Sequence, residues 1–264
     1  MTDDTAGWAA FDGAVDTHCH LFLLDEGPAL AVAAAWEAGV SRMVCVGIDP
    51  ESSRRSLELA ESFRGVFASA GVHPHSASAF DRTAGAVVEE LLADPLVVAV
   101  GETGLDYYRR LSPVEDQQRA FRTHIALSRE TDKPLVVHVR EAWEDALRIL
   151  EEEGAERVVL HCFSGDAAAA GEAGRRGYFT SFAGNVTYPN AAPLRAAAAA
   201  ADAERILVET DSPFLAPQHV RGRPNAPANV VAVAEALAEI RELGLDQMLA
   251  RTTAAAREAF PLLR

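Results

Sequence analysis

Short apolar runs alternate with longer segments of helical composition along almost the whole chain. Several of the runs are continuously apolar, which is typical of parallel strands buried on both faces. Between them lie polar and apolar residues in helical order, as in residues 52–63, 114–130 and 141–153. The predicted strands are Ala14–His18, Arg42–Gly47, Val66–Val72, Val97–Glu102, Leu135–Val139, Arg157–His161, Tyr178–Phe182 and Ile206–Thr210.

This strict alternation of strand and helix, repeated eight times, predicts an α/β fold of the (β/α)8 TIM barrel type. The alternative is an open doubly wound sheet, but no glycine-rich phosphate loop follows the first predicted strand. A chain of 264 residues with 49% apolar content suffices for one such barrel. Because no Pro/Ser-rich linker or abrupt charge shift divides it, we expect residues 1–264 to form a single domain.

Composition favours a cytoplasmic protein without a membrane segment. The N-terminus, MTDDTAGWAAFDG, is acidic where a signal peptide would be basic, and no apolar run is long enough to span a bilayer. Three cysteines, an odd number, give no disulfide framework. No stable protein partner is inferred.

The net charge of −15 argues against binding of long nucleic-acid tracts, which usually requires a basic surface. It does not exclude the processing of a few nucleotides at a chain end, because bound cations can dominate the charge inside a cleft.

Candidate metal ligands begin in the stretch VDTHCHLFL, residues 15–23. On an extended strand Asp16, His18 and His20 would share one side, and Val15 and Cys19 the other. Two imidazoles aimed at one point suggest a metal site, although polar residues at a strand end are the alternative interpretation of this stretch alone.

Further ligand types follow the other predicted strands, and in a TIM barrel these strand ends meet at one edge. Imidazoles and carboxylates together suit Zn²⁺, Mn²⁺ or a similar divalent ion. Six ligands are too many for one tetrahedral ion, so the sequence predicts a site for two divalent metal ions, Zn, Mn or Mg. The predicted ligands are His18, His20, Glu102, His138, His161 and Asp211.

The chain resembles the TatD family of metal-dependent hydrolases in seven stretches that run in order to about residue 230: DTHCHL, GVHPH, GETGLDYYR, HIALSRETDKPLVVHVREA, HCFSG, ETDSPFL and, more loosely, RGRPNAPANV. The resemblance implies a divalent-metal deoxyribonuclease that trims DNA from the 3′ end. It also implies that His18, His20 and Asp211 hold one metal, that His138 and His161 hold the other, and that Glu102 faces both.

A carbamylated lysine, which bridges the metals in many binuclear amidohydrolases, is excluded here. The only lysine, Lys133, precedes the fifth predicted strand and therefore lies at the opposite end of the barrel. Glu102 is the natural bridging carboxylate. Glu209 shares the parity of Asp211, so we expect it to point inward and to pair with a ligand histidine or with Arg140.

Substrate contacts are expected at the same edge. His73 follows the third strand, where it would bind a phosphate or protonate a leaving group, or only cap its loop. Arg140 would clamp a phosphate. Predicted loops at this rim also carry Arg109, Arg221 and Arg223, for which solvated surface charges are the alternative. Where the family usually has Asn-Glu-Pro, the chain has Asn225-Ala226-Pro227, a departure that bears on substrate preference.

The sequence therefore predicts an enzyme that hydrolyses phosphodiester bonds at nucleic-acid ends, with Asp211, Glu102 and His73 as catalytic residues. Two alternatives stay open. One is hydrolysis of another ester or amide, such as aminoacyl-tRNA, and the other is a metal-bound scaffold without turnover.

Overall fold

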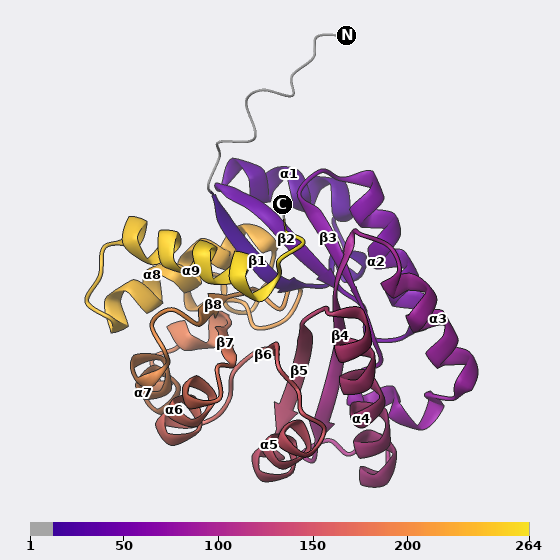
Figure 1. Cartoon of the computed structure of the whole chain (residues 1–264). Helices are drawn as coiled ribbons and strands as arrows, with labels where there is room; N and C mark the ends of the chain where they lie inside the picture. Colours follow the sequence, from indigo (N-terminus) through magenta and orange to yellow (C-terminus); the bar gives the residue numbers. More distant parts are fainter. Residues whose placement is uncertain (1–12, 264) are drawn as a thin grey trace, which may run out of the picture.

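The computed structural model describes residues 13–263, and all eight predicted strands are present (Figure 1). They pair in parallel in the order of the sequence. The strands are β1 Ala14–Cys19, β2 Val40–Val46, β3 Val66–Ala70, β4 Val97–Asp106, β5 Leu135–Arg140, β6 Val158–Leu160, β7 Phe179–Phe182 and β8 Ile206–Val208.

The sheet closes where the end of β1 meets the residues after β8. Cys19 and Ser212 form a parallel bridge, and the His20 backbone N–H donates to the Ser212 carbonyl at 2.8 Å. Eight parallel strands closed in this way form a (β/α)8 barrel, which confirms the predicted fold class.

Helices occupy the connections between the strands (Figure 1). Local sequence sets their ends. For example, Asp49 caps the start of α2 because its side chain accepts from the Ser52 backbone N–H, and Pro50 is the first residue of the helix. The helices are α1 Pro28–Glu37, α2 Pro50–Ser62, α3 Arg82–Leu92, α4 Val114–Thr131, α5 Trp143–Glu152, α6 Ala167–Arg175, α7 Ala192–Ala200, α8 Val230–Ile240 and α9 Leu245–Ala259. Within the described part of the chain, no helix is long and apolar enough to cross a membrane.

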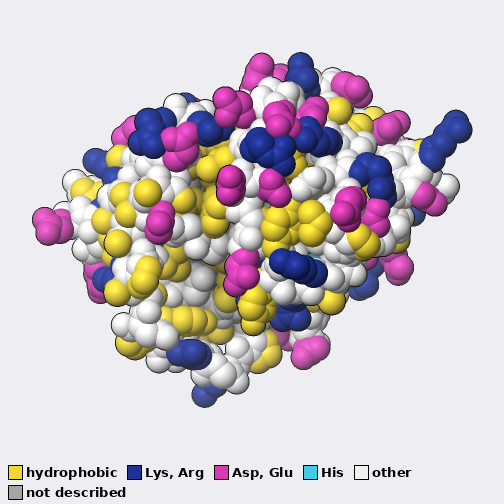
Figure 2. All heavy atoms as spheres, turned by 90° about the horizontal axis from the view of Figure 1, so that it is seen from below, with side chains coloured by type: hydrophobic (Ala, Val, Ile, Leu, Met, Phe, Trp, Pro, Cys, Tyr) yellow, Lys and Arg dark blue, Asp and Glu magenta, His cyan; other side chains and the backbone are white. Residues whose placement is uncertain are grey.

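Two layers of apolar side chains hold the barrel together. The larger lies between the strands and the surrounding helices. The smaller lines the barrel interior, where strand residues such as Val44 and Val136 pack with Ala256 and Phe260 at the end of α9. Because α9 covers the amino ends of the strands, the carboxyl ends are left as the open face. The strands run downward in Figure 1, so Figure 2 looks onto that face.

Strand β4 is longer than the sequence predicted, and Glu102 therefore lies within it. Between Val100 and Thr103 this strand advances three residues while β5 advances two, which is a β-bulge. Gly101 has φ +128, and a Cβ there would lie 2.5 Å from the Val136 carbonyl oxygen. Glycine thus permits a close approach at the bulge, and pairing with β5 continues as far as Asp106.

The expectation that side chains alternate regularly between the two faces of β1, with Val15 and Cys19 on the same face, is wrong. Val15 packs inside the barrel, whereas Cys19 packs against the helix layer, so the two do not share a side. The cause is a register shift against β2 between Asp16 and Cys19, where β1 again contains one extra residue. The Asp16 carboxylate accepts from the backbone N–H groups of His18 and Thr210 and from the Thr210 hydroxyl, and so ties β1 to the end of β8.

Candidate metal centre

Glu102 lies at the centre of a cluster of histidines at the open end of the barrel. Its side chain is almost fully buried, and its two oxygens face imidazole nitrogens that come from the ends of β1, β3, β5 and β6. The separations from Glu102 are 3.4 Å to His18 Nε2, 3.3 Å to His73 Nε2, 3.1 Å to His138 Nδ1 and 2.9 Å to His161 Nε2. The bulge in β4 thus turns one carboxylate toward four strand ends.

On one side of Glu102, the two histidines of the His-x-His stretch meet Asp211. The Nε2 atoms of His18 and His20 are 3.3 Å apart, and Asp211 Oδ1 lies 3.5 Å from His20 Nε2. His20 Nδ1 donates to the Val46 carbonyl at 2.8 Å, so the lone pair of the neutral ring is on Nε2 and points into the cluster. His18, His20 and Glu102 each place one ligand atom within 4.8 Å of the others.

On the other side of Glu102, His138 and His161 are each held by a further carboxylate. His138 Nε2 lies 3.3 Å from Asp106 Oδ2, which leaves Nδ1 facing Glu102. His161 Nδ1 lies 3.1 Å from Glu209 Oε1, which leaves Nε2 facing Glu102. A carboxylate on the outer nitrogen is the usual way in which a ligating histidine is oriented.

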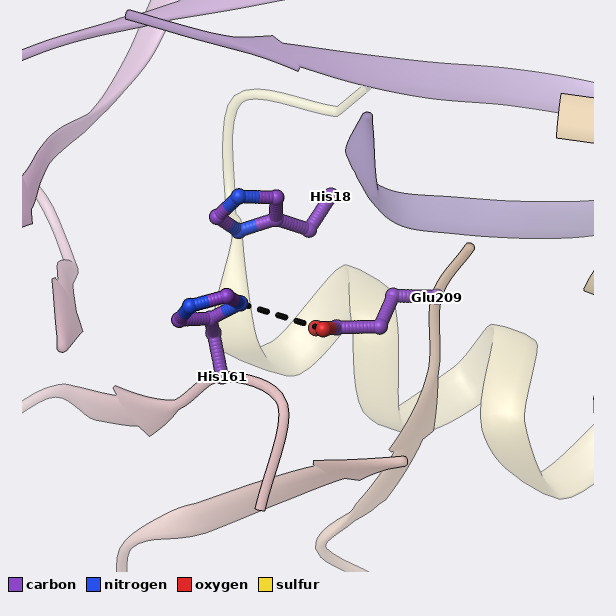
Figure 3. Close-up of side chains that lie close together, drawn as sticks. All are labelled: His18, His161 and Glu209. Atoms are coloured by element: carbon purple, nitrogen blue, oxygen red, sulfur yellow. Dashed lines mark hydrogen bonds and ion pairs between the residues drawn. The ribbon is translucent and has the colours of Figure 1, made fainter. Parts of the chain in front are cut away.

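Figure 3 shows the pairing of His161 with Glu209 beside the ring of His18. The two imidazoles stack at a centroid distance of 3.9 Å, so candidate ligands from opposite sides of Glu102 are in direct contact. Glu209 also accepts from the Cys162 backbone N–H at 2.9 Å. The expectation that Glu209 points inward and pairs with one of the predicted ligand histidines is confirmed for its contact with His161.

His73 has a different arrangement of protons from the other histidines. Its Nδ1 accepts from the His75 backbone N–H at 3.1 Å, so the proton of the neutral ring is on Nε2, which faces Glu102. Burial lowers the pKa of His73 to about 4, although the nearby Glu102 carboxylate opposes this. The ring therefore caps its loop and also presents an N–H donor to the cluster.

Two carboxylates of the cluster, Glu102 and Asp211, have lowered pKa values. Burial alone raises the pKa of Glu102, but the neighbouring histidines outweigh it and hold the pKa well below its usual range. Burial is likewise outweighed at Asp211, whose pKa is lowered mainly by the hydrogen bond from His20. Burial opposes protonation of His20, His138 and His161, but the neighbouring carboxylates outweigh it and raise the pKa values of these histidines. Without a metal, the site therefore holds carboxylates paired with protonated imidazoles.

No basic side chain pairs with these acids in the described part of the chain. Within residues 13–263, Glu102, Asp106, Glu209 and Asp211 form ion pairs only with histidines. Buried carboxylates require positive charge nearby, which protonated histidines supply here and which a bound metal would supply in their place. Neutral imidazole nitrogens beside carboxylate oxygens form a donor set that suits Zn²⁺ or Mn²⁺.

The predicted substrate arginines lie further out, on the loops around the cluster. Arg140 is exposed at the end of β5, with its guanidinium 4.0 Å from the centre of the Tyr108 ring. The Arg221 guanidinium lies over Tyr188 at 4.4 Å. Exposed positions in the loops after β4 and β8 carry the remaining two, Arg109 and Arg223.

Lys133 lies far from this cluster, as the sequence predicted. Its ammonium donates to the carbonyl groups of Leu92, Asp94 and Val97 near the amino ends of the strands. Glu102 is thus the central carboxylate without any contribution from a lysine.

Sequence reasoning missed Asp106, and it interpreted His124 only as a packing residue of its helix. Asp106 joins His138 to His75, whose Nε2 is 2.8 Å from Asp106 Oδ2. The aspartate lies in the GETGLDYYR stretch, but the strand was predicted to end before it. His124, on α4, accepts from the Val72 backbone N–H at 3.0 Å, directly before His73.

Comparisons with known proteins found a matching family model, similar sequences and similar solved structures. A family model described as TatD related DNase matches residues 15–261. The chain is 38% identical over 249 residues to the uncharacterized metal-dependent hydrolase YabD of Bacillus subtilis, covering 93% of this chain and 98% of that protein. It is 35% identical over 239 residues to the 3′-5′ ssDNA/RNA exonuclease TatD of Erwinia amylovora, and the match covers 88% of this chain and 92% of that protein. The crystal structure of YJJV, a TatD homolog from Escherichia coli, superposes with a TM-score of 0.88 at 28% sequence identity. The superposition covers 94% of this chain and 98% of that chain.

Proposed function

The chain belongs to the TatD-related DNase family of metal-dependent hydrolases, and from this premise we propose that it hydrolyses phosphodiester bonds at the ends of single-stranded nucleic acid. One relative, 35% identical, is named as a 3′-5′ exonuclease on single-stranded DNA and RNA. In this chain, the observation that carries the proposal is the set of buried carboxylates whose only ion-pair partners among the described residues are histidines.

Two groups of side chains would hold divalent ions, Zn, Mn or Mg. His18, His20 and Asp211 form one group, His138 and His161 form the other, and Glu102 lies between them. When bound, such ions activate water and neutralise charge on phosphoryl oxygens.

Asp211 would accept the proton of the attacking water. Its side chain is 15% exposed, whereas that of Glu102 is 4% exposed, so Asp211 is the more accessible carboxylate. The hydrogen bond from His20 helps to keep its pKa low, and the carboxylate is therefore ready to accept a proton at neutral pH.

His73 and Arg140 would contact the substrate. The His73 Nε2–H is a neutral donor that can bind a phosphoryl oxygen next to the ligands. Arg140 extends from the same strand as His138 and supplies a guanidinium for a neighbouring phosphate. We place the reaction in the cytoplasm, as the sequence predicted.

The test is an assay of the chelator-treated protein, reloaded with Mg²⁺, Mn²⁺ or Zn²⁺, on 3′-labelled single-stranded DNA and RNA. Aminoacyl-tRNA and a generic carboxylic ester serve as competing substrates. We expect metal-dependent release of nucleotides from one end, and its loss in His73→Ala with metal content unchanged. Turnover of the ester or of aminoacyl-tRNA alone would contradict the nuclease proposal, and absence of any metal-dependent turnover would favour a scaffold.

A further inference from the structure

A pocket of about 390 Å³ opens between the loops that follow β6 and β7. Its volume falls in the range of small-molecule sites. The β6 loop contributes Ser164 and Asp166, and the β7 loop and the start of α7 contribute Asn185, Tyr188, Asn190 and Leu194. None of these residues belongs to the cluster around Glu102.

The pocket lies at the same end of the barrel as the metal ligands. Ser164 follows His161 by three residues, and its hydroxyl donates to the Val139 carbonyl at 3.0 Å, next to His138. The Tyr188 hydroxyl donates to the Ala216 carbonyl at 2.9 Å, in the loop that continues from Asp211. Hydrogen bonds therefore connect the pocket to β5, which carries His138, and to the loop that follows Asp211.

Tyr188 is a fixed wall of this pocket. Its hydroxyl is anchored on Ala216, and the Arg221 guanidinium lies 4.4 Å from the ring centre. No carboxylate within residues 13–263 forms an ion pair with Arg221, so its charge is available to a phosphate at the rim. A tyrosine held in this way offers a rigid aromatic surface at little entropic cost.

The polar groups of the pocket suit a nucleobase better than a phosphate. The side-chain amides of Asn185 and Asn190 make no hydrogen bond to other described residues, and each can both donate and accept. The Asp166 carboxylate caps α6 through its Oδ1, which accepts from the Ala169 backbone N–H, and it places negative charge at the pocket. No Lys or Arg lines the pocket.

We propose that this pocket binds the base of the terminal nucleotide while the adjoining phosphodiester lies at the metal ligands, an inference that rests on the proposed nuclease function. The base packs against Tyr188 and Leu194, and its edge is bound by the two amides. The Arg221 guanidinium, which lies over the Tyr188 ring, would contact the backbone. Because a carboxylate accepts from exocyclic amino groups, Asp166 favours cytosine, adenine or guanine over thymine and uracil.

Binding of dCMP and of 2-deoxyribose 5-phosphate, measured by calorimetry, tests the pocket without turnover. We expect the base-free compound to bind roughly tenfold more weakly, as stacking of one base on an aromatic side chain predicts. Tyr188→Leu should remove this difference, whereas Tyr188→Phe, which retains the ring, should preserve it. Asp166→Asn keeps a good helix cap and should reduce the preference for dCMP over TMP. Leu30→Ala, an exposed apolar change on α1, controls for nonspecific effects.

Equal binding of dCMP and 2-deoxyribose 5-phosphate to the wild-type protein would overturn the base site, even if the enzyme degrades DNA. Asn190→Ala gives a second measure should Tyr188→Leu fold poorly, and unchanged dCMP affinity in this exposed variant would also count against the site. Conversely, a tenfold preference for dCMP in a protein that cleaves no nucleic acid would support the base site and refute the nuclease function. The two proposals can therefore fail separately.

Discussion

His20, His138 and His161 each use one ring nitrogen for a hydrogen bond or ion pair with a group other than Glu102. The corresponding nitrogen of His18, Nδ1, is buried and has no partner among the described residues. The partner is the Val46 carbonyl for His20, the Asp106 carboxylate for His138 and the Glu209 carboxylate for His161. For His73 the outer nitrogen accepts instead, so its inward nitrogen carries a proton. His73 therefore differs from the other histidines in its hydrogen bonding, while its ligand atom also lies within 4.8 Å of those of Glu102 and His138.

At the scale of single residues, Glu102→Gln should abolish high-affinity metal binding and reduce turnover severely. A neutral amide is a weaker ligand and removes the negative charge between the two groups. Metal content by elemental analysis and kcat on single-stranded DNA give the readouts. The comparison variant is Lys133→Met, which leaves three carbonyl groups without their donor and should cost about 1–3 kcal/mol of stability while retaining metal. Loss of metal in the lysine variant would contradict this assignment.

His124 should make stability depend on pH. Burial lowers its pKa to about 4, below the usual 6.5, so between these values the unfolded chain binds a proton that the folded chain does not. Stability from this group is present above pH 6.5 and is lost as pH falls toward 4, by up to about 3 kcal/mol.

Denaturant unfolding across this pH range, compared between wild type and His124→Gln, measures the effect. Glutamine can still accept from the Val72 backbone N–H but does not titrate, so its stability should fall less on acidification. Equal pH dependence in the two proteins would exclude His124 as the cause.

At the scale of elements, the sequence identified the eight strands, and the residues predicted as metal ligands come together at the carboxyl end of the sheet. Where prediction failed, the cause was a local change of register. The bulge in β4 extends that strand to Asp106, and the shift in β1 breaks the alternation from Val15 to Cys19. Such bulges depend on pairing with a neighbouring strand, which periodicity along one strand does not report.

The extension of β4 leads to a prediction about Asp106. Because this carboxylate orients His138 through Nε2, Asp106→Asn should weaken one metal site by about 10- to 100-fold and leave the other intact. Metal titration of the apoprotein followed by elemental analysis would show one tight and one weakened equivalent. The matched control is Asp145→Asn, an aspartate on α5 that pairs with Arg148. Weakening of both sites to the same extent would mean that the two groups do not bind independently.

For the whole molecule, closure of the amino ends by α9 leaves one face for access to the cluster. On that face apolar side chains gather in the middle, and acidic and basic residues are mixed around them (Figure 2). Such a surface has no continuous basic track for a long polyanion, in keeping with the net charge of −15. A nucleic-acid substrate would therefore be held at its end.

End binding predicts a shallow salt dependence. If two or three phosphates are engaged, the slope of log K against log salt for single-stranded DNA should be about −1.5 to −2, since each phosphate contributes about −0.7. Fluorescence anisotropy of a 3′-labelled oligonucleotide across a KCl series, with a metal that does not support turnover, measures this slope. Arg140→Ala should make the slope shallower by about 0.7, the contribution of one phosphate, because the variant removes a guanidinium and leaves every candidate metal ligand in place. A slope several times steeper, or efficient cutting of closed circular DNA, would show that the protein binds along the strand instead of at its end.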